Sequence, residues 1–174
     1  DEGRYHLHLR QLHAQVGIDL CLTPRKPPIR HGIDGVVKGV SGEDMFYYFI
    51  PRCALAGTVL LPGGPEDVMS GHGWYDHEFG LHEGKTTGAD ERKKGQEIGW
   101  NWLGLQLDDG RELSAYRMVD DHTGDSIGQL AVLVDADGNR HAWHDFDLVG
   151  EAVWTSTRTF ADYPATGQGR LLGG

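Results

Sequence analysis

Short runs in which apolar and polar residues alternate, separated by glycine- and proline-rich turns, cover most of this 174-residue chain. The run 5–12 is typical, since Tyr5, Leu7 and Leu9 alternate with polar neighbours. A period of two gives a strand two distinct faces, whereas no stretch of useful length has the 3.6-residue period of a helix. The 26 glycines punctuate the chain at short intervals. The sequence therefore predicts an all-β protein, either an antiparallel lipocalin-like barrel or a strongly curved sandwich.

The expected strands follow from this pattern. They are 5–12, 16–22, 36–40, 45–50, 54–61, 71–80, 98–108, 128–135, 140–148 and 149–157. Pro51 is expected to end the strand 45–50, because proline cannot donate a ladder hydrogen bond. Asp109-Gly110 and Asp137-Gly138 predict two-residue hairpin turns. These turns set the register that pairs Trp102 with Arg117, Gln106 with Leu113, Asp135 with Arg140, and Val132 with Trp143.

Two segments lack a strand pattern. Residues 81–97 are polar and charged, which favours a solvated connection over the alternative, a mobile loop above a site. Residues 165–174 are small and glycine-rich, and they predict a disordered tail or the truncated start of a second domain. We therefore expect one β domain over 1–164.

Composition excludes several classes of partner. The net charge of −10 argues against binding to a nucleic-acid backbone. No apolar run approaches the roughly 20 residues that span a bilayer as a helix. The chain begins at Asp1 without a leader-like segment, as expected for a processed protein or a fragment. Cys21 and Cys53 are expected to be buried free thiols rather than a disulfide, and they do not define the compartment.

The stretch 71–80 concentrates aromatic rings, carboxylates and histidines within ten residues. On a strand, Trp74, Asp76 and Glu78 share one face, and Tyr75, His77 and Phe79 share the other. One face is thus acidic and aromatic, and the other is suited to packing. Carboxylates are costly to bury unless they are paired, so this concentration requires either solvent or a chemical task.

The predicted hairpin register adds neighbours to the acidic face. Trp100, Trp102 and Arg117 are expected near Trp74 and Asp76, forming a polar aromatic chamber. A carboxylic acid against indole rings is a candidate proton donor, and indole faces attract a cation by about 0.5–2 kcal/mol. The structural alternative is an ion pair in which Arg117 or His77 neutralises Asp76 or Glu78. From residue types alone, this structural alternative is favoured.

Metal and cofactor motifs are weak. His6 and His8 on one strand face, and His141 with His144, suit zinc, yet neither pair has a third ligand at a recognised interval. The chain has no nucleophile elbow, phosphate-binding loop or dinucleotide fingerprint. We therefore expect neither a metal nor a cofactor.

Several motifs together resemble the carotenoid 1,2-hydratase family, also called hydroxyneurosporene synthase or AttH-like. The central ones are GWYDHEFG at 73–80, GWNW at 99–102 and QLDDGREL at 106–113. Supporting ones are HGIDG at 31–35, YYFIPR at 47–52, LAGTV at 55–59, and WTS at 154–156 with Tyr163-Pro164. The resemblance covers roughly residues 30 to 164. Phe49 departs from the pattern, which usually has serine there, and the chain ends soon after Pro164 where the family continues.

The resemblance implies two consecutive lipocalin-like β domains with a cavity for a hydrophobic small molecule, of which this chain is the first. It also implies addition of water to an isoprenoid double bond, a link to carotenoid biosynthesis, and a slight preference for a secreted or periplasmic location. Members are also described as predicted secreted hydrolases. The cavity would lie between the two domains or within them, and this domain is expected to pack against the second.

The first hypothesis is a hydratase or related lyase acting on an isoprenoid or polyketide-like ligand. Asp76, or alternatively Glu78, would protonate the alkene. The expected ligand-binding residues are Tyr48, Trp74, Trp100, Asn101, Trp102, Gln106 and Arg117. The second hypothesis is a lipocalin-like carrier of a hydrophobic small molecule without chemistry, and the third is an accessory domain at the cell surface. A likeness of fold does not by itself decide among them.

Overall fold

The computed structural model describes residues 3–11, 13–32, 34–38, 44–80, 98–120 and 122–171. Over these residues the regular structure is entirely β, and every strand pair is antiparallel. The strands are β1 Tyr5–Gln11, β2 Val16–Pro24, β3 Ile29–Arg30, β4 Val36–Lys38, β5 Asp44–Leu61, β6 Gly64–Val68, β7 His72–Gly80, β8 Ile98–Gln106, β9 Glu112–Asp120, β10 Ser126–Val134, β11 Arg140–Trp143, β12 Phe146–Thr155 and β13 Asp162–Leu171. The predicted all-β, antiparallel class is confirmed.

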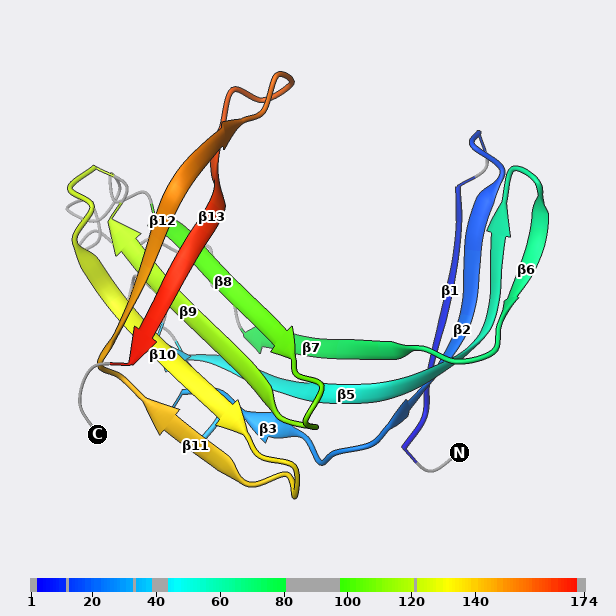
Figure 1. The fold of residues 1–174 in the computed structure, drawn as a ribbon, viewed down its shortest axis with the longest axis horizontal. Helices are drawn as coiled ribbons and strands as arrows, with labels where there is room; N and C mark the ends of the chain where they lie inside the picture. Colours follow the sequence, from blue (N-terminus) through cyan, green and yellow to red (C-terminus); the bar gives the residue numbers. More distant parts are fainter. Residues whose placement is uncertain are drawn as a thin grey trace.

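The 18-residue strand β5 organises the first sheet and bends along its length (Figure 1). Its first half pairs with β3, β4 and β7, and its second half pairs mainly with β2 and β6. Strand β1 adds to β2 at the outer edge, completing seven strands.

Pro51 does not end a strand, contrary to the sequence prediction. The pairing of β5 with β7 shifts by one residue between Ile50 and Cys53, which forms a bulge around Pro51. A bulge leaves one residue unpaired, so the missing N–H of proline costs no ladder bond there. The segments 45–50 and 54–61 are therefore one continuous, bent strand.

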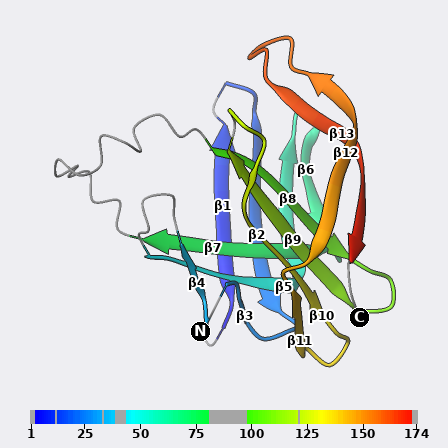
Figure 2. The same ribbon diagram turned by 90° about the vertical axis from the view of Figure 1, so that its left-hand side faces the viewer.

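The other strands form a four-stranded sheet, ordered β11-β10-β9-β8, and the β12–β13 hairpin. The inner face of the four-stranded sheet packs on the first half of β5 through Tyr47 and Phe49, which meet Tyr116 and Leu130 in one buried cluster. Its outer face is covered by the hairpin, where Phe146 packs on alanines of β9 and β10. In both views the hairpin lies on the side of the molecule away from β1 and β2 (Figures 1 and 2).

Strands β7 and β8 border an open seam. Among the described residues β7 pairs only with β5, and β8 pairs only with β9, so no ring of strands closes into a barrel. The architecture is therefore a strongly curved, open pair of sheets. Residues 81–97, expected to be a solvated connection or a mobile loop, lie outside the described residues.

Both Asp-Gly hairpins differ from the predicted two-residue turns. Leu107 N–H donates to Arg111 O at 2.8 Å, and Asp135 N–H donates to Asn139 O at 3.0 Å, so each loop has three residues. Gly110 (φ 83°) ends the first loop in the left-handed conformation that glycine permits. The extra residue shifts both registers by one: Trp102 pairs with Tyr116, and Val132 pairs with Ala142.

Of the two alternatives predicted for 165–174, a disordered tail is wrong for residues 165–171, and the start of a second domain stays a prediction. These residues belong to β13, which pairs with β12 from Thr155↔Asp162 to Phe146↔Leu171. Backbone hydrogen bonding in a hairpin does not require apolar alternation, so this strand lacked a sequence signal. Both cysteines are free, as expected; Cys53 is buried and Cys21 is partly buried.

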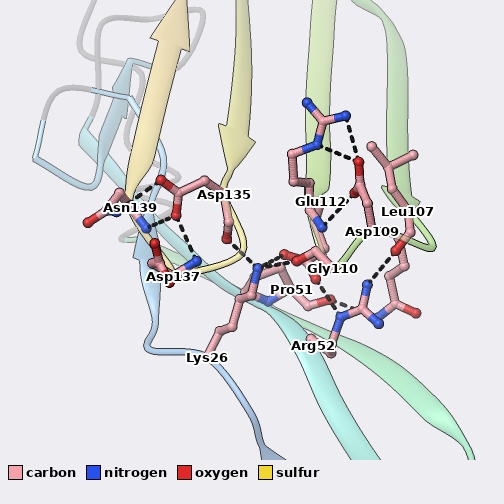
Figure 3. A network of polar contacts seen from close by, with 12 residues as sticks. Lys26, Pro51, Arg52, Leu107, Asp109, Gly110, Glu112, Asp135, Asp137 and Asn139 are labelled. Atoms are coloured by element: carbon pink, nitrogen blue, oxygen red, sulfur yellow. Dashed lines mark hydrogen bonds and ion pairs between the residues drawn. The ribbon is translucent and has the colours of Figure 1, made fainter.

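A buried carboxylate joins the two sheets. Glu112 at the start of β9 has no exposed surface and accepts hydrogen bonds from Lys26 Nζ at 2.7 Å and Arg52 Nε at 2.5 Å (Figure 3). Lys26 Nζ also donates to the backbone oxygens of Gly110 and Asp135, at 2.6 and 2.5 Å, in the two three-residue loops. Each of the three ammonium protons thus has an acceptor, and β5, β9 and both loops are fixed together.

We expect Glu112→Gln to lower the free energy of unfolding by about 3–5 kcal/mol, because it leaves two cations near a neutral buried amide. Urea denaturation at pH 7 measures the change. The matched control is Glu66→Gln on β6, where the side chain is exposed and the expected change is below about 0.5 kcal/mol. Equal losses in the two variants would contradict a clamping role for Glu112.

Candidate functional site

Asp76 is the centre of the polar aromatic group at the seam. Its Oδ1 accepts hydrogen bonds from the Tyr47 hydroxyl at 2.7 Å and from the Trp74 indole N–H at 3.0 Å. Within the described part of the chain, Oδ2 accepts none. One carboxylate oxygen is thus fixed in place, and the other is available on an exposed side chain.

Alternation along β7 produces this arrangement. Trp74 packs against the inner core and Tyr75 against the cluster on the opposite face, as a strand requires. Glu78 lies on the Asp76 face, directly opposite Tyr47 in the register. The two carboxylates are therefore neighbours on one face.

Aromatic rings from both sheets line the seam around Asp76. Trp74 stacks on Phe49 with centroids 5.0 Å apart, and it meets Trp102 edge to face at 6.1 Å. On β8 and β9, Trp100 stacks on Tyr116 at 5.3 Å. Trp100 and Trp102 keep 44% and 42% of their surface exposed, so indole faces are available to a ligand.

The Tyr47 ring packs against the ring of His31, which has no exposed surface. The two rings are stacked with centroids 4.5 Å apart and an interplanar angle of 2°. His31 Nε2 and Ser114 Oγ form a 3.0 Å hydrogen bond, and His31 Nδ1 has no partner in the described structure. Burial, and then the hydrogen bond to Asp76, raise the pKa of Tyr47 far above its ordinary value, so the phenol remains a donor.

Tyr47, His31 and Ser114 were not predicted as site residues. In the sequence, Tyr47 stands out only as part of the YYFIPR motif, and His31 only as part of the HGIDG motif. Their contacts join residues 83 positions apart in the chain, as for His31 and Ser114, and no local pattern predicts such a pair.

Tyr48, predicted to bind the ligand, lies on the face of the sheet opposite to Asp76, so the structure does not bring it together with the carboxylates of the seam. It is paired with His77 in the register, and the two rings stack at 5.2 Å. Successive residues of a strand point to opposite faces, so the Tyr48 side chain is directed away from Asp76.

Arg117 and Asn101 lie on the outer face of the four-stranded sheet. The one-residue register shift pairs Arg117 with Asn101 instead of Trp102, so the predicted proximity of Arg117 to the tryptophans is wrong. Among the described residues Asp76 forms no ion pair with Arg117 or with His77, which bonds the Tyr75 hydroxyl at 2.9 Å. The ion pair predicted as the structural alternative to a chemical role for Asp76 is therefore not formed among the described residues.

Gln106 supports the strands beneath the seam. Its side-chain N–H groups donate to the Pro51 and Gly73 backbone oxygens, at 2.7 and 3.1 Å, which fixes β7 against the bulge of β5. The side-chain amide nitrogen of Gln106, a predicted ligand-binding residue, is therefore occupied by the protein itself.

No three His, Cys, Asp or Glu side chains gather as metal ligands among the described residues. The described part of the chain also contains no helix long and apolar enough to cross a membrane.

The fold and the seam define an open, antiparallel all-β protein with an acid among tryptophans. The family model described as AttH-like matches residues 1–170, so the chain belongs to the AttH-like family. No curated protein matches the sequence.

Two solved structures share the fold. An AttH from Nitrosomonas europaea is 24% identical with a TM-score of 0.77, and the match covers 97% of this chain and 50% of that one. Kievitone hydratase from Nectria haematococca is 16% identical with a TM-score of 0.69, covering 97% and 49%. The chain thus spans about half the length of these proteins, and at such identities the likeness concerns the fold.

We expect His31 to make stability depend on pH. Burial, and then the charge of Arg140, lower its pKa to about 4 from an ordinary 6.5. The unfolded chain therefore binds the proton first, so the stabilisation is complete above pH 6.5 and is lost as the pH falls toward 4, by about 3 kcal/mol in all.

Urea denaturation of wild type and His31→Gln between pH 7.5 and 4 measures this loss, because other groups titrate in both proteins. The difference between the two should shrink by about 3 kcal/mol as the pH falls. His13→Gln, at an exposed position, should track wild type at every pH. A constant difference for His31→Gln would show that His31 does not titrate abnormally.

Proposed function

We propose that the protein belongs to the hydratase-like members of its family and promotes addition of water to a C=C bond of a hydrophobic ligand at the seam. One observation carries the proposal: two donors converge on Asp76 Oδ1 and leave Oδ2 free beside exposed indole rings. An acid next to aromatic faces suits a reaction that passes through a carbocation.

The proposed step begins with Asp76 in its protonated form. The alkene π pair forms a C–H bond to the proton on Oδ2, which leaves a carboxylate and a cation on the adjacent carbon. A water oxygen then bonds to that carbon and gives one proton back to Asp76, so the net change is addition of one water without oxidation or reduction. General acid catalysis of this kind contributes typically about 10²–10⁴-fold.

Tyr47 and Trp74 would orient the acid. Their hydrogen bonds fix Oδ1, and the stacked His31 and Phe49 rings fix the two donors in turn. Trp102 and Trp100 would face the cation, which an indole face attracts by about 0.5–2 kcal/mol. Glu78 is the alternative acid, since it lies on the same exposed face.

The comparisons support this proposal at the level of family and fold. The chain belongs to the AttH-like family, and one protein of the same fold is named a kievitone hydratase. Fold alone does not carry an activity, so the support for a particular step comes from Asp76 and its two donors.

A non-catalytic carrier is the second candidate, favoured by the exposure of Trp100 and Trp102. Exposed rings bind an apolar molecule whether or not an acid acts on it. In that case a ligand recovered after incubation is unchanged in mass. For either function, we propose that a second β domain covers part of the apolar hairpin surface, where Val153 and Trp154 are 68% and 56% exposed.

Asp76→Asn should lower the rate of hydration by about 10²–10⁴-fold, with Glu78→Gln tested in parallel. Tyr47→Phe should lower it less, because it removes one of two orienting hydrogen bonds. The measurement is incorporation of heavy-oxygen water into kievitone or geraniol, followed by mass spectrometry, in the longest natural form that contains this chain.

Asp147→Asn, an exposed carboxylate change on β12, is the matched control and should leave the rate unchanged. Unaltered turnover in both Asp76→Asn and Glu78→Gln would remove these carboxylates from the mechanism. Retention of the ligand without added oxygen in wild type would favour the carrier.

A further inference from the structure

The face of the seven-stranded sheet opposite to Asp76 carries a second cavity, of about 640 Å³. This volume lies within the usual range for small-molecule sites, about 300–1,000 Å³. Its lining is mainly aromatic, with Arg30 and Asp34 beside five rings: Tyr5, Phe46, Tyr47, Tyr48 and Phe79. Neither Asp76 nor Glu78, the two carboxylates at the seam, lines this cavity.

The register explains why these side chains share one face. Arg30 on β3 is opposite Tyr48 on β5, and Tyr48 is in turn opposite His77 on β7. Two residues along, Phe46 is opposite Phe79. Directly opposed residues lie on the same face of a sheet, so these two rows form a continuous surface of rings that ends in one cation.

The Phe46 and Phe79 rings are stacked with centroids 5.4 Å apart and an interplanar angle of 22°. They remain 42% and 49% exposed. Tyr48 and His77 form a second stacked pair next to them, at 5.2 Å. Large, ordered, exposed rings at the border of a cavity indicate a surface that a flat apolar molecule can cover.

Arg30 gives this cavity a charge preference. Its backbone oxygen accepts a bond from Arg140, but its guanidinium forms no hydrogen bond or ion pair with any described residue. The side-chain stem runs past Gly35, whose φ of 91° and missing side chain leave room for it. In a chain with a net charge of −10, a free guanidinium beside aromatic rings is a selective point for an anion.

Asp34 provides the opposite charge on the same lining and lies outside ion-pair distance of Arg30. A ligand with a single anionic group is therefore held in one orientation, with that group at Arg30 and away from Asp34.

We propose that this cavity is a binding site for a planar aromatic or conjugated molecule with one anionic group, separate from the seam. The rings would bind the apolar body, and Arg30 would bind the anion. Tyr47 borders both sites, but Arg30, Tyr48, Phe46 and Phe79 lie on the face of the sheet opposite to Asp76. The proposal therefore does not depend on hydration at Asp76.

Two fluorescent probes test it on the whole chain: 1-anilinonaphthalene-8-sulfonate, which is anionic, and N-phenyl-1-naphthylamine, which is not. The double variant Phe46→Ala, Phe79→Ala should raise Kd for both probes by about tenfold, because stacked ring contacts are lost. Arg30→Gln should raise Kd about tenfold for the sulfonate alone and leave the amine within about twofold.

Phe160→Ala is the matched control, since this ring is 82% exposed between β12 and β13. It should change neither Kd, and Asp76→Asn should change neither. The proposal is overturned if Phe46→Ala, Phe79→Ala leaves both affinities intact, if Arg30→Gln weakens both probes equally, or if only Trp74→Phe reduces binding. Urea denaturation of each variant confirms that the folded state is compared, and single variants at Phe46 or Phe79 replace the double if it unfolds.

Discussion

The pairing of buried Glu112 with Lys26 and Arg52 is the interaction on which the rest of the molecule depends. Open sheets lack the closed hydrogen-bond ring that holds a barrel together, so their relative placement needs another restraint. A carboxylate without solvent exposure is stable only while both cations remain, and each of these comes from the first sheet or its connection. Because Lys26 also bonds both hairpin loops, a single side chain fixes the ends of all four strands of the second sheet.

This restraint explains how the seam can be both open and ordered. Arg52 lies in the bulge of β5, and Gln106 bonds the backbone of Pro51 and of Gly73 next to it. The contacts of Gln106, the last residue of β8, thus fix the position of β7 relative to β8. Toward the other end, hydrogen bonds from Tyr47 and Trp74 hold the Asp76 carboxylate at the surface, although no strand ladder joins β7 to β8. Alternation along the first half of β5, before the bulge, places Tyr47 at the seam and Tyr48 on the opposite face, so one strand contributes to both surfaces.

The sequence was sufficient for the fold class and for the division of β7 into two faces, because both depend on a period of two. Prediction from the sequence failed where a difference of one residue in turn length sets the strand register. Asp-Gly fits both a two-residue and a three-residue hairpin, and the difference moved Arg117 from the tryptophans to the opposite face of its sheet. The contacts of His31 with Tyr47 and Ser114 were out of reach for another reason. They join distant segments, and a buried histidine has no signature that separates it from an exposed one in a single sequence.

The proposal that Asp76 faces a ligand at the seam is tested most directly by heteronuclear NMR of the five indole N–H groups. Titration with geraniol or kievitone should shift the resonances of Trp74, Trp100 and Trp102 and leave those of Trp143 and Trp154 in place. Asp76→Asn should move the Trp74 resonance before any ligand is added, because it weakens the acceptor of that N–H. A ligand-induced shift confined to Trp143 or Trp154, or a Trp74 resonance insensitive to Asp76→Asn, would contradict the site described at the seam.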